Sequence, residues 1–170
     1  MLVVMSGLPG TGKSTLAERV AARLRIPVLS VDAIESAILR AGVAPTFATG
    51  LAAYLVAETL ADAQVRTGQG VIVDAVNAVE PAKAMWRDLA ARHGLAPRIV
   101  ECSCADEALH RERLAARGQR FERFPEPTWD DVVRRRREYT PWREPVLAID
   151  AARPLEGNVE RVLAWIAGGG

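Results

Sequence analysis

The chain has 170 residues, 22 of them basic and 21 acidic, so its formal net charge is +1. This length suits one α/β domain with a buried core and is too short for two ordinary domains. The near-neutral charge gives no general reason to expect a nucleic-acid or membrane partner. Neither a signal peptide nor a membrane span is recognisable, which predicts a cytoplasmic protein.

A glycine-rich stretch follows the first predicted strand, residues 2–5. Its sequence is Gly7-Leu8-Pro9-Gly10-Thr11-Gly12-Lys13-Ser14-Thr15. The spacing matches the P-loop, whose backbone N–H groups turn inward around a polyphosphate. Lys13 would reach the β- and γ-phosphates from the start of the next helix, and Ser14 would offer a hydroxyl to Mg²⁺. An ordinary glycine-rich turn does not require Lys-Ser at this spacing, so we expect residues 7–15 to bind the phosphates of a nucleotide.

An acidic residue follows the second predicted strand, residues 26–31. Asp32 lies where a helix over residues 33–40 is expected to begin. Aspartate is a common helix N-cap. The same position is also the carboxyl edge of the predicted sheet, where open parallel sheets bind ligands. The two roles are compatible, and we favour a functional one for Asp32.

A third predicted strand, residues 71–74, also ends in an acid, after a predicted loop over 42–50 and a helix over 51–67. A carboxylate on a strand beside a P-loop orients Mg²⁺, directly or through water. We therefore expect Ser14 and Asp74 to hold the metal. Asn77, just past this strand, would either contact substrate or end the loop.

The fourth predicted strand, residues 98–103, leads into a helix that carries several arginines. Ser103 and Asp106 have the spacing of a capping box for that helix. Arg113 and Arg117 are four residues apart and therefore share a helical face. They form either a solvated basic face or a pair of guanidinium groups aimed at phosphates. Cys102 and Cys104, two positions apart along the strand, are expected to be ordinary thiols rather than a disulfide.

The last third of the chain contains a predicted lid and two further elements. Residues 118–128 show little periodicity, which is typical of a mobile segment, and Thr128 is expected to cap a helix. Four arginines at 134–137 fan around that helix, so they cannot all serve one site. A strand over 146–149 and a helix over 158–167 complete the chain. Five strands that alternate with helices predict a parallel sheet with right-handed crossovers.

Four motifs together resemble the small P-loop kinases, in the group related to polynucleotide kinase, chloramphenicol phosphotransferase, gluconate kinase and zeta toxin. These motifs are the P-loop of residues 7–15, Ser30-Val31-Asp32, Val71-Ile72-Val73-Asp74-Ala75 and Glu112-Arg113-Leu114-Ala115-Ala116-Arg117. The resemblance covers almost the whole chain. It implies a three-layer α/β P-loop NTPase fold with a five-stranded parallel sheet in the order 2-3-1-4-5. The expected protein is a single nucleoside-monophosphate-kinase-like domain, residues 1–170, with a short lid over about 113–128.

The resemblance also implies a reaction, transfer of the γ-phosphoryl group of ATP to an acceptor hydroxyl with Mg²⁺ as cofactor. Asp32 looks like the general base or the group that orients the hydroxyl. The phosphates and the metal would be held by Lys13, Ser14 and Asp74. The implied catalytic groups are Lys13, Asp32, Arg113 and Arg117, the two arginines neutralising charge as the lid closes. Such a reaction depends mainly on positioning and electrostatics.

Three functions remain open at this point. A kinase that acts on a small molecule or a sugar is favoured, because Asp32 and the lid arginines have roles in it. A kinase for 5′-hydroxyl ends of nucleic acids would need a basic groove near Arg120, Arg123 and residues 134–137, and the neutral charge argues against it. The third is a non-catalytic or regulatory nucleotide-binding protein.

Overall fold

The computed structural model describes residues 1–116, 118, 121–122 and 125–168. Its strands are β1 (Leu2–Ser6), β2 (Val28–Ser30), β3 (Val71–Asp74), β4 (Arg98–Ser103) and β5 (Val146–Asp150). Its helices are α1 (Lys13–Leu24), α2 (Val31–Arg40), α3 (Phe47–Arg66), α4 (Glu80–Arg92), α5 (Glu107–Ala116), α6 (Trp129–Glu138) and α7 (Leu155–Ala167). Within this described part, no helix has the length and apolar character needed to cross a membrane.

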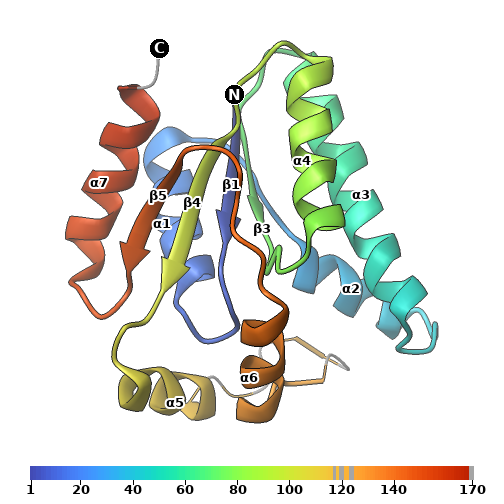
Figure 1. The fold of residues 1–170 in the computed structure, drawn as a ribbon. Helices are drawn as coiled ribbons and strands as arrows, with labels where there is room; N and C mark the ends of the chain where they lie inside the picture. The colour runs from blue at the N-terminus through green and yellow to red at the C-terminus, as the bar shows by residue number, and fades with distance from the viewer. Residues whose placement is uncertain (117, 119–120, 123–124, 169–170) are drawn as a thin grey trace.

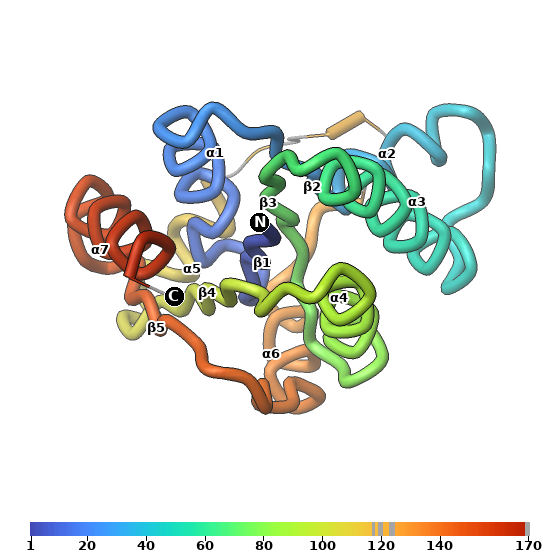
Figure 2. The backbone as a smooth tube through the Cα atoms, turned by 90° about the horizontal axis from the view of Figure 1, so that it is seen from above, coloured from blue at the N-terminus to red at the C-terminus, as the bar shows by residue number. Residues whose placement is uncertain are grey.

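The five strands form one parallel sheet in the order β2-β3-β1-β4-β5, which confirms the predicted strand order. Helices α1 and α7 lie on one face of this sheet, while α3 and α4 stand together on the other (Figures 1 and 2). Beyond the carboxyl ends of the strands lie α5 and α6 (Figure 1). The architecture is the predicted three-layer P-loop NTPase fold.

Strand β1 supplies side chains to the cores on both faces of the sheet. Leu2 and Val4 pack in the cluster that includes α3 and α4, whereas Val3 and Met5 pack in the cluster that includes α1 and α7. All four are almost fully buried. A central parallel strand buried on both faces reads as a continuous apolar run, which is why the sequence reveals β1 so clearly.

Several helix starts differ from their predicted positions. Helix α3 begins at Phe47, because the Thr46 hydroxyl accepts a hydrogen bond from the Thr49 backbone N–H at 3.3 Å. The predicted loop over 42–50 is therefore shorter. Gly50 lies inside α3, and a Cβ on it would be in ordinary van der Waals contact with the Glu35 carboxylate of α2, at 3.7 Å. Helix α7 begins at Leu155, earlier than expected.

Two capping predictions have different outcomes. Ser103 and Asp106 do not form a capping box: Asp106 alone accepts the Leu109 N–H at 3.0 Å, and the Ser103 hydroxyl donates to the Ile149 carbonyl at 3.4 Å. Ser103 is still part of β4, so its hydroxyl faces the neighbouring strand. The cap of α6 at Thr128 is confirmed.

The segment after α6 is attached to the end of β1. The hydroxyls of Ser6 and Tyr139 are 2.6 Å apart, and the Trp142 indole N–H donates to the Ser6 hydroxyl at 3.2 Å. Because Ser6 immediately precedes the P-loop, these bonds hold the end of α6 against the edge of the sheet where the glycine-rich stretch begins.

Candidate active site

The glycine-rich stretch has backbone conformations and close contacts that require glycine. Gly7 has φ +146°, and a Cβ built on it would lie 2.3 Å from the Cys102 carbonyl oxygen of β4. Gly12 has φ +76° and directly precedes α1. Both angles lie where residues with a side chain are rarely found. The loop can therefore follow the end of β4 closely and present its backbone N–H groups at the N-terminus of α1.

Lys13 and Asp74 form a buried pair at the start of α1. Their side chains are only 6% and 3% exposed, and Lys13 Nζ lies 3.6 Å from Asp74 Oδ1. The pairing of β1 with β3 aligns Met5 with Asp74, which sets the carboxylate beside the strand that leads into the P-loop. Within the described residues, Asp74 Oδ1 has no hydrogen-bond donor. An oxygen of this kind fits a hydrated Mg²⁺ ion.

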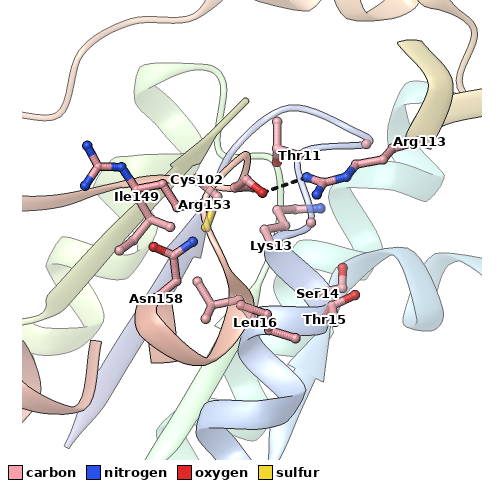
Figure 3. Close-up of a pocket in the computed structure, with 14 residues that line it drawn as sticks. Thr11, Lys13, Ser14, Thr15, Leu16, Cys102, Arg113, Ile149, Arg153 and Asn158 are labelled. Carbon is pink, nitrogen blue, oxygen red and sulfur yellow. Dashed lines mark hydrogen bonds between the residues drawn. The ribbon is translucent and has the colours of Figure 1, made fainter. Parts of the chain in front are cut away.

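A cavity of about 380 Å³ lies between the P-loop, the end of β5 and the start of α7 (Figure 3). It is lined by residues 10–16 of the loop and of α1, together with Arg113 and Arg153. Arg113 is held there, because its Nη1 donates to the Ala151 carbonyl at 2.8 Å, the dashed line in Figure 3. The structure thus brings Arg113 to the P-loop, while Arg117 lies outside the described residues.

A second cavity, of about 370 Å³, lies on the other side of the P-loop strand, among α2, α3, α4 and α6. Asp32 lines it from the first turn of α2. The cap of that helix is Ser30, whose hydroxyl accepts the Ala33 N–H at 3.4 Å, so the N-cap role considered for Asp32 is wrong. The sheet order places β3, with Asp74, between the strand that leads to Asp32 and the strand that leads to the P-loop.

The second cavity contains three polar side chains that the sequence does not single out, Glu35, Tyr54 and Glu138, together with Arg135 of the arginine run. One signal was available, since Asp32 and Glu35 are three residues apart and therefore share a face of α2. For Tyr54 and Glu138 no local signal existed, because their helices reach the cavity only through tertiary packing.

Tyr54 and Asn77 connect this cavity to the core. The Asn77 backbone N–H donates to the Tyr54 hydroxyl at 3.2 Å, and the side chain of Asn77 bonds both the Met5 carbonyl and the Trp86 indole. Asn77 is fully buried with φ +51°. Of its two predicted roles, ending the loop is therefore the one that the structure supports. Burial raises the pKa of Tyr54 to about 12, so this phenol stays neutral.

Glu35 carries the clearest electrostatic signature of the cavity. Burial raises the pKa of its carboxyl, the negative charge of Asp32 raises it further, and Arg135 offsets part of the rise. Since the folded-state pKa lies above the unfolded one, protonated Glu35 favours folding. This contribution to the free energy of unfolding is fully present below the pKa of the unfolded state, about 4.3. It is lost as the pH rises through the pKa of Glu35 in the folded state.

Glu35→Gln is therefore expected to raise the melting temperature slightly at pH 7 and to leave it unchanged near pH 4. Thermal unfolding followed by circular dichroism at both values measures this. Glu112→Gln, at an exposed position on α5, is the matched control and should leave the melting temperature as in the parent. A Glu35→Gln variant that is less stable than the parent at pH 7 would contradict the raised pKa of Glu35.

His110 of α5 links the P-loop to α6. Its Nε2 donates to the Pro9 carbonyl at 2.7 Å, and its ring meets the Trp129 ring edge-on with centroids 5.1 Å apart. Arg111 and Arg136 lie over the same indole, 4.1 and 5.5 Å from the ring centroid. His110 is only 1% exposed. This contact fixes the loop backbone from outside the phosphate-binding face.

Replacement of His110 by alanine is expected to weaken nucleotide binding about fivefold, the value of one ordinary hydrogen bond. The reason is that the Pro9 carbonyl loses the donor that positions the loop. Isothermal titration calorimetry with ATP measures the dissociation constants. His110→Gln, which keeps an N–H donor, should recover part of the loss, and equal dissociation constants for both variants would refute a positioning role.

The four consecutive arginines of α6 point in different directions, as predicted. Arg134 pairs with Asp131 of its own helix at 2.7 Å, and Arg136 lies 3.7 Å from Glu107 of α5. Arg135 alone among the four lines the second cavity. The groove proposed for nucleic-acid ends would also need Arg120 and Arg123, which lie outside the described residues.

Comparison with protein families matches residues 2–139 to a family described as an AAA domain. The chain belongs to this family. The AAA-domain match runs from β1 through α6 and therefore includes the P-loop, Asp32 and Asp74. Together with the observed fold, it confirms the resemblance to the small P-loop kinases. A search of the curated proteins found no significant match.

Solved structures of similar fold include two kinases and a protein bound to ADP-AlF3. A gluconokinase from Sinorhizobium meliloti is 20% identical, with 98% of this chain and 91% of that one covered and a TM-score of 0.72. The Mycobacterium tuberculosis APS kinase, solved with AMPPNP and APS, is also 20% identical, with 98% and 97% covered and a TM-score of 0.70. Chaetomium thermophilum Kti12, solved with ADP-AlF3, is 17% identical, with 99% and 98% covered and a TM-score of 0.76. At identities of 17–20%, this similarity shows that the chain shares the fold of these proteins.

Proposed function

We propose that the protein is an ATP-dependent phosphotransferase that moves the γ-phosphoryl group of ATP to a hydroxyl of a small-molecule acceptor. The observation that carries this proposal is the placement of two cavities at the same edge of the sheet. One contains the P-loop and Arg113, and the other contains Asp32. A nucleotide with its phosphates on the loop would then present its terminal phosphate toward the second cavity.

The nucleotide half of the site consists of residues 7–15 and Arg113. Backbone N–H groups of the loop would bind the phosphate oxygens, and the Lys13 ammonium would neutralise the β- and γ-phosphates. Ser14 and Asp74 are the residues that would hold Mg²⁺, which supplies further neutralisation of the same phosphates. Arg113, already fixed beside the loop, would add positive charge as the terminal phosphate leaves, and Arg117 is proposed to act with it.

The acceptor half depends on Asp32. Its carboxylate would accept the proton of the acceptor hydroxyl while that oxygen forms a bond to the γ-phosphorus. The bond between this phosphorus and the bridging oxygen breaks, and ADP leaves with the electron pair. The role of Asp32 is to orient the hydroxyl in line and to receive its proton. This assignment requires an acceptor small enough for a cavity of about 370 Å³.

The segment between α5 and α6 is proposed as the lid of a single domain, residues 1–170. Residues 113–116 continue α5, so the lid itself would be shorter than the predicted 113–128. The Ser36 hydroxyl of α2 donates to the Glu122 carbonyl at 2.8 Å, which joins this segment to the helix that carries Asp32. A lid in this place would exclude water from the terminal phosphate.

The test is a panel of alcohol acceptors incubated with ATP and Mg²⁺. ADP release above the acceptor-free rate is measured, and the phosphorylated product is identified by ³¹P NMR and mass spectrometry. The proposal expects at least one acceptor to give stoichiometric ADP and phosphate ester. Tight ATP binding without ester formation from any acceptor would favour the non-catalytic alternative, and transfer to oligonucleotide 5′-hydroxyls alone would favour the nucleic-acid alternative.

A further inference from the structure

The cavity that contains Asp32 has an apolar wall on α3. Phe47, Leu51 and Tyr54 follow one another at intervals of four and three residues, so they share one face of the helix. Phe47 is 88% exposed and Leu51 43% exposed at the mouth of the cavity. Met85 of α4 also lines the cavity. Covering these side chains with an apolar group would remove exposed hydrocarbon from water, which favours binding.

The charged residues that line this cavity in the described part of the chain are mainly acidic. Among the described lining residues, Asp32, Glu35 and Glu138 are carboxylates and Arg135 is a guanidinium group. Glu35 is partly buried and lies against Gly50 of α3, and a Cβ on that glycine would be 3.7 Å from the carboxylate. A negative excess beside an apolar wall favours a cationic ligand and opposes an anionic one.

We propose that the acceptor is an amphipathic alcohol that carries a protonated amine, an inference that rests on the proposed function of this site. Its hydroxyl would meet Asp32, its ammonium would pair with Glu35, and its apolar body would lie on Phe47 and Leu51. Glu138 at the rim adds to the negative potential. A sugar acid or a sulfate or phosphate ester places negative charge beside these carboxylates and is disfavoured.

The spacing on α2 limits the distance between the two polar groups of the acceptor. Asp32 and Glu35 are three residues apart on one helical face, where Cβ atoms are about 5–6 Å apart. A hydroxyl and an ammonium that contact both carboxylates are therefore separated by only a few bonds. This geometry fits a 1,2- or 1,3-amino alcohol with an attached apolar or aromatic group.

Binding of three matched compounds tests the inference at pH 7 in the presence of AMPPNP and Mg²⁺. They share one frame and differ in charge: 2-amino-2-phenylethanol is cationic, its N-acetyl derivative is neutral, and 3-hydroxy-2-phenylpropanoate is anionic. Dissociation constants come from ¹⁵N NMR titration, with the amides of Gly50 and Tyr54 as reporters of the cavity. We expect the amine to bind at least about tenfold more tightly than the carboxylate, the effect of one favourable charge pair against one unfavourable pair.

Glu35→Gln should weaken binding of the amine about fivefold and leave the neutral compound unchanged, whereas Glu112→Gln on α5 should change neither. The amine inference is overturned if the carboxylate binds as tightly as the amine, if the amine produces no shifts at millimolar concentration, or if Glu35→Gln leaves its affinity unaltered.

The two proposals can fail separately in this design. If an anionic alcohol is phosphorylated with release of ADP, the proposed phosphotransferase activity stands and the proposed amine acceptor is wrong. If the amine binds specifically but no acceptor yields a phosphate ester, the proposed ligand class stands and the proposed phosphotransferase activity is wrong.

Discussion

Replacement of Lys13 by methionine is expected to lower phosphoryl transfer by about 10³-fold and to destabilise the nucleotide-free protein at the same time. The loss of rate follows from removing a fixed positive charge at the phosphates. The loss of stability follows because Asp74, only 3% exposed, would be left as a buried carboxylate without its cation. Breaking a buried pair by removing one partner costs about 3–5 kcal/mol. Transfer rates and thermal unfolding at pH 7 measure the two effects.

The double variant Lys13→Met with Asp74→Asn separates these effects. Removal of the buried negative charge should restore most of the melting temperature, since no unpaired ion remains. Activity should stay as low as in the single variant, because neither the phosphate cation nor the proposed metal ligand is present. If the double variant is no more stable than Lys13→Met, the 3.6 Å pair contributes little to the fold, and the stability argument fails.

Asp32→Asn is expected to reduce phosphoryl transfer by about 10²–10⁴-fold while ATP binding is unchanged. Asparagine keeps the size of the side chain but cannot receive the proton of the acceptor hydroxyl. The helix should remain intact, because its cap is Ser30 and not Asp32. Acceptor-dependent ADP release and the dissociation constant of a fluorescent ATP analogue are the two measurements.

Asp88→Asn, at an exposed position on α4, is the matched control and should behave as the parent protein. If Asp32→Asn transfers the phosphoryl group to every acceptor at the parent rate, Asp32 has no role in the mechanism.

The nucleotide half of the site could be predicted because it is local in sequence. A P-loop consists of consecutive backbone amides, and its lysine occupies the first turn of the helix that follows, so nine adjacent residues contain the pattern. The requirement for glycine at Gly7 was also predictable in kind. The contact that excludes a side chain there could not be predicted, because a Cβ would clash with the carbonyl oxygen of Cys102, which is far away in the chain.

Helix boundaries were less predictable where tertiary contacts oppose local preference. Gly50 and Pro45 favour a loop, yet α3 extends through Gly50 to Phe47. The helix forms there because α3 packs against α2, and Thr49 and Ala53 in its first two turns are buried. Local propensity is a weak guide when a neighbouring helix supplies such packing.

The sequence by itself determined the phosphate-binding loop and the position of Asp32 at the edge of the sheet, because these follow from adjacent residues and from the regular geometry of parallel strands. The strand order was implied by the resemblance to the small P-loop kinases, and the fold confirms it. Only the tertiary structure decided the content of the acceptor cavity. Glu35, Tyr54, Arg135 and Glu138 come from three helices, and only long-range packing brings the relevant faces of those helices together. The same packing placed His110 beneath the P-loop, at a contact that spans 101 residues.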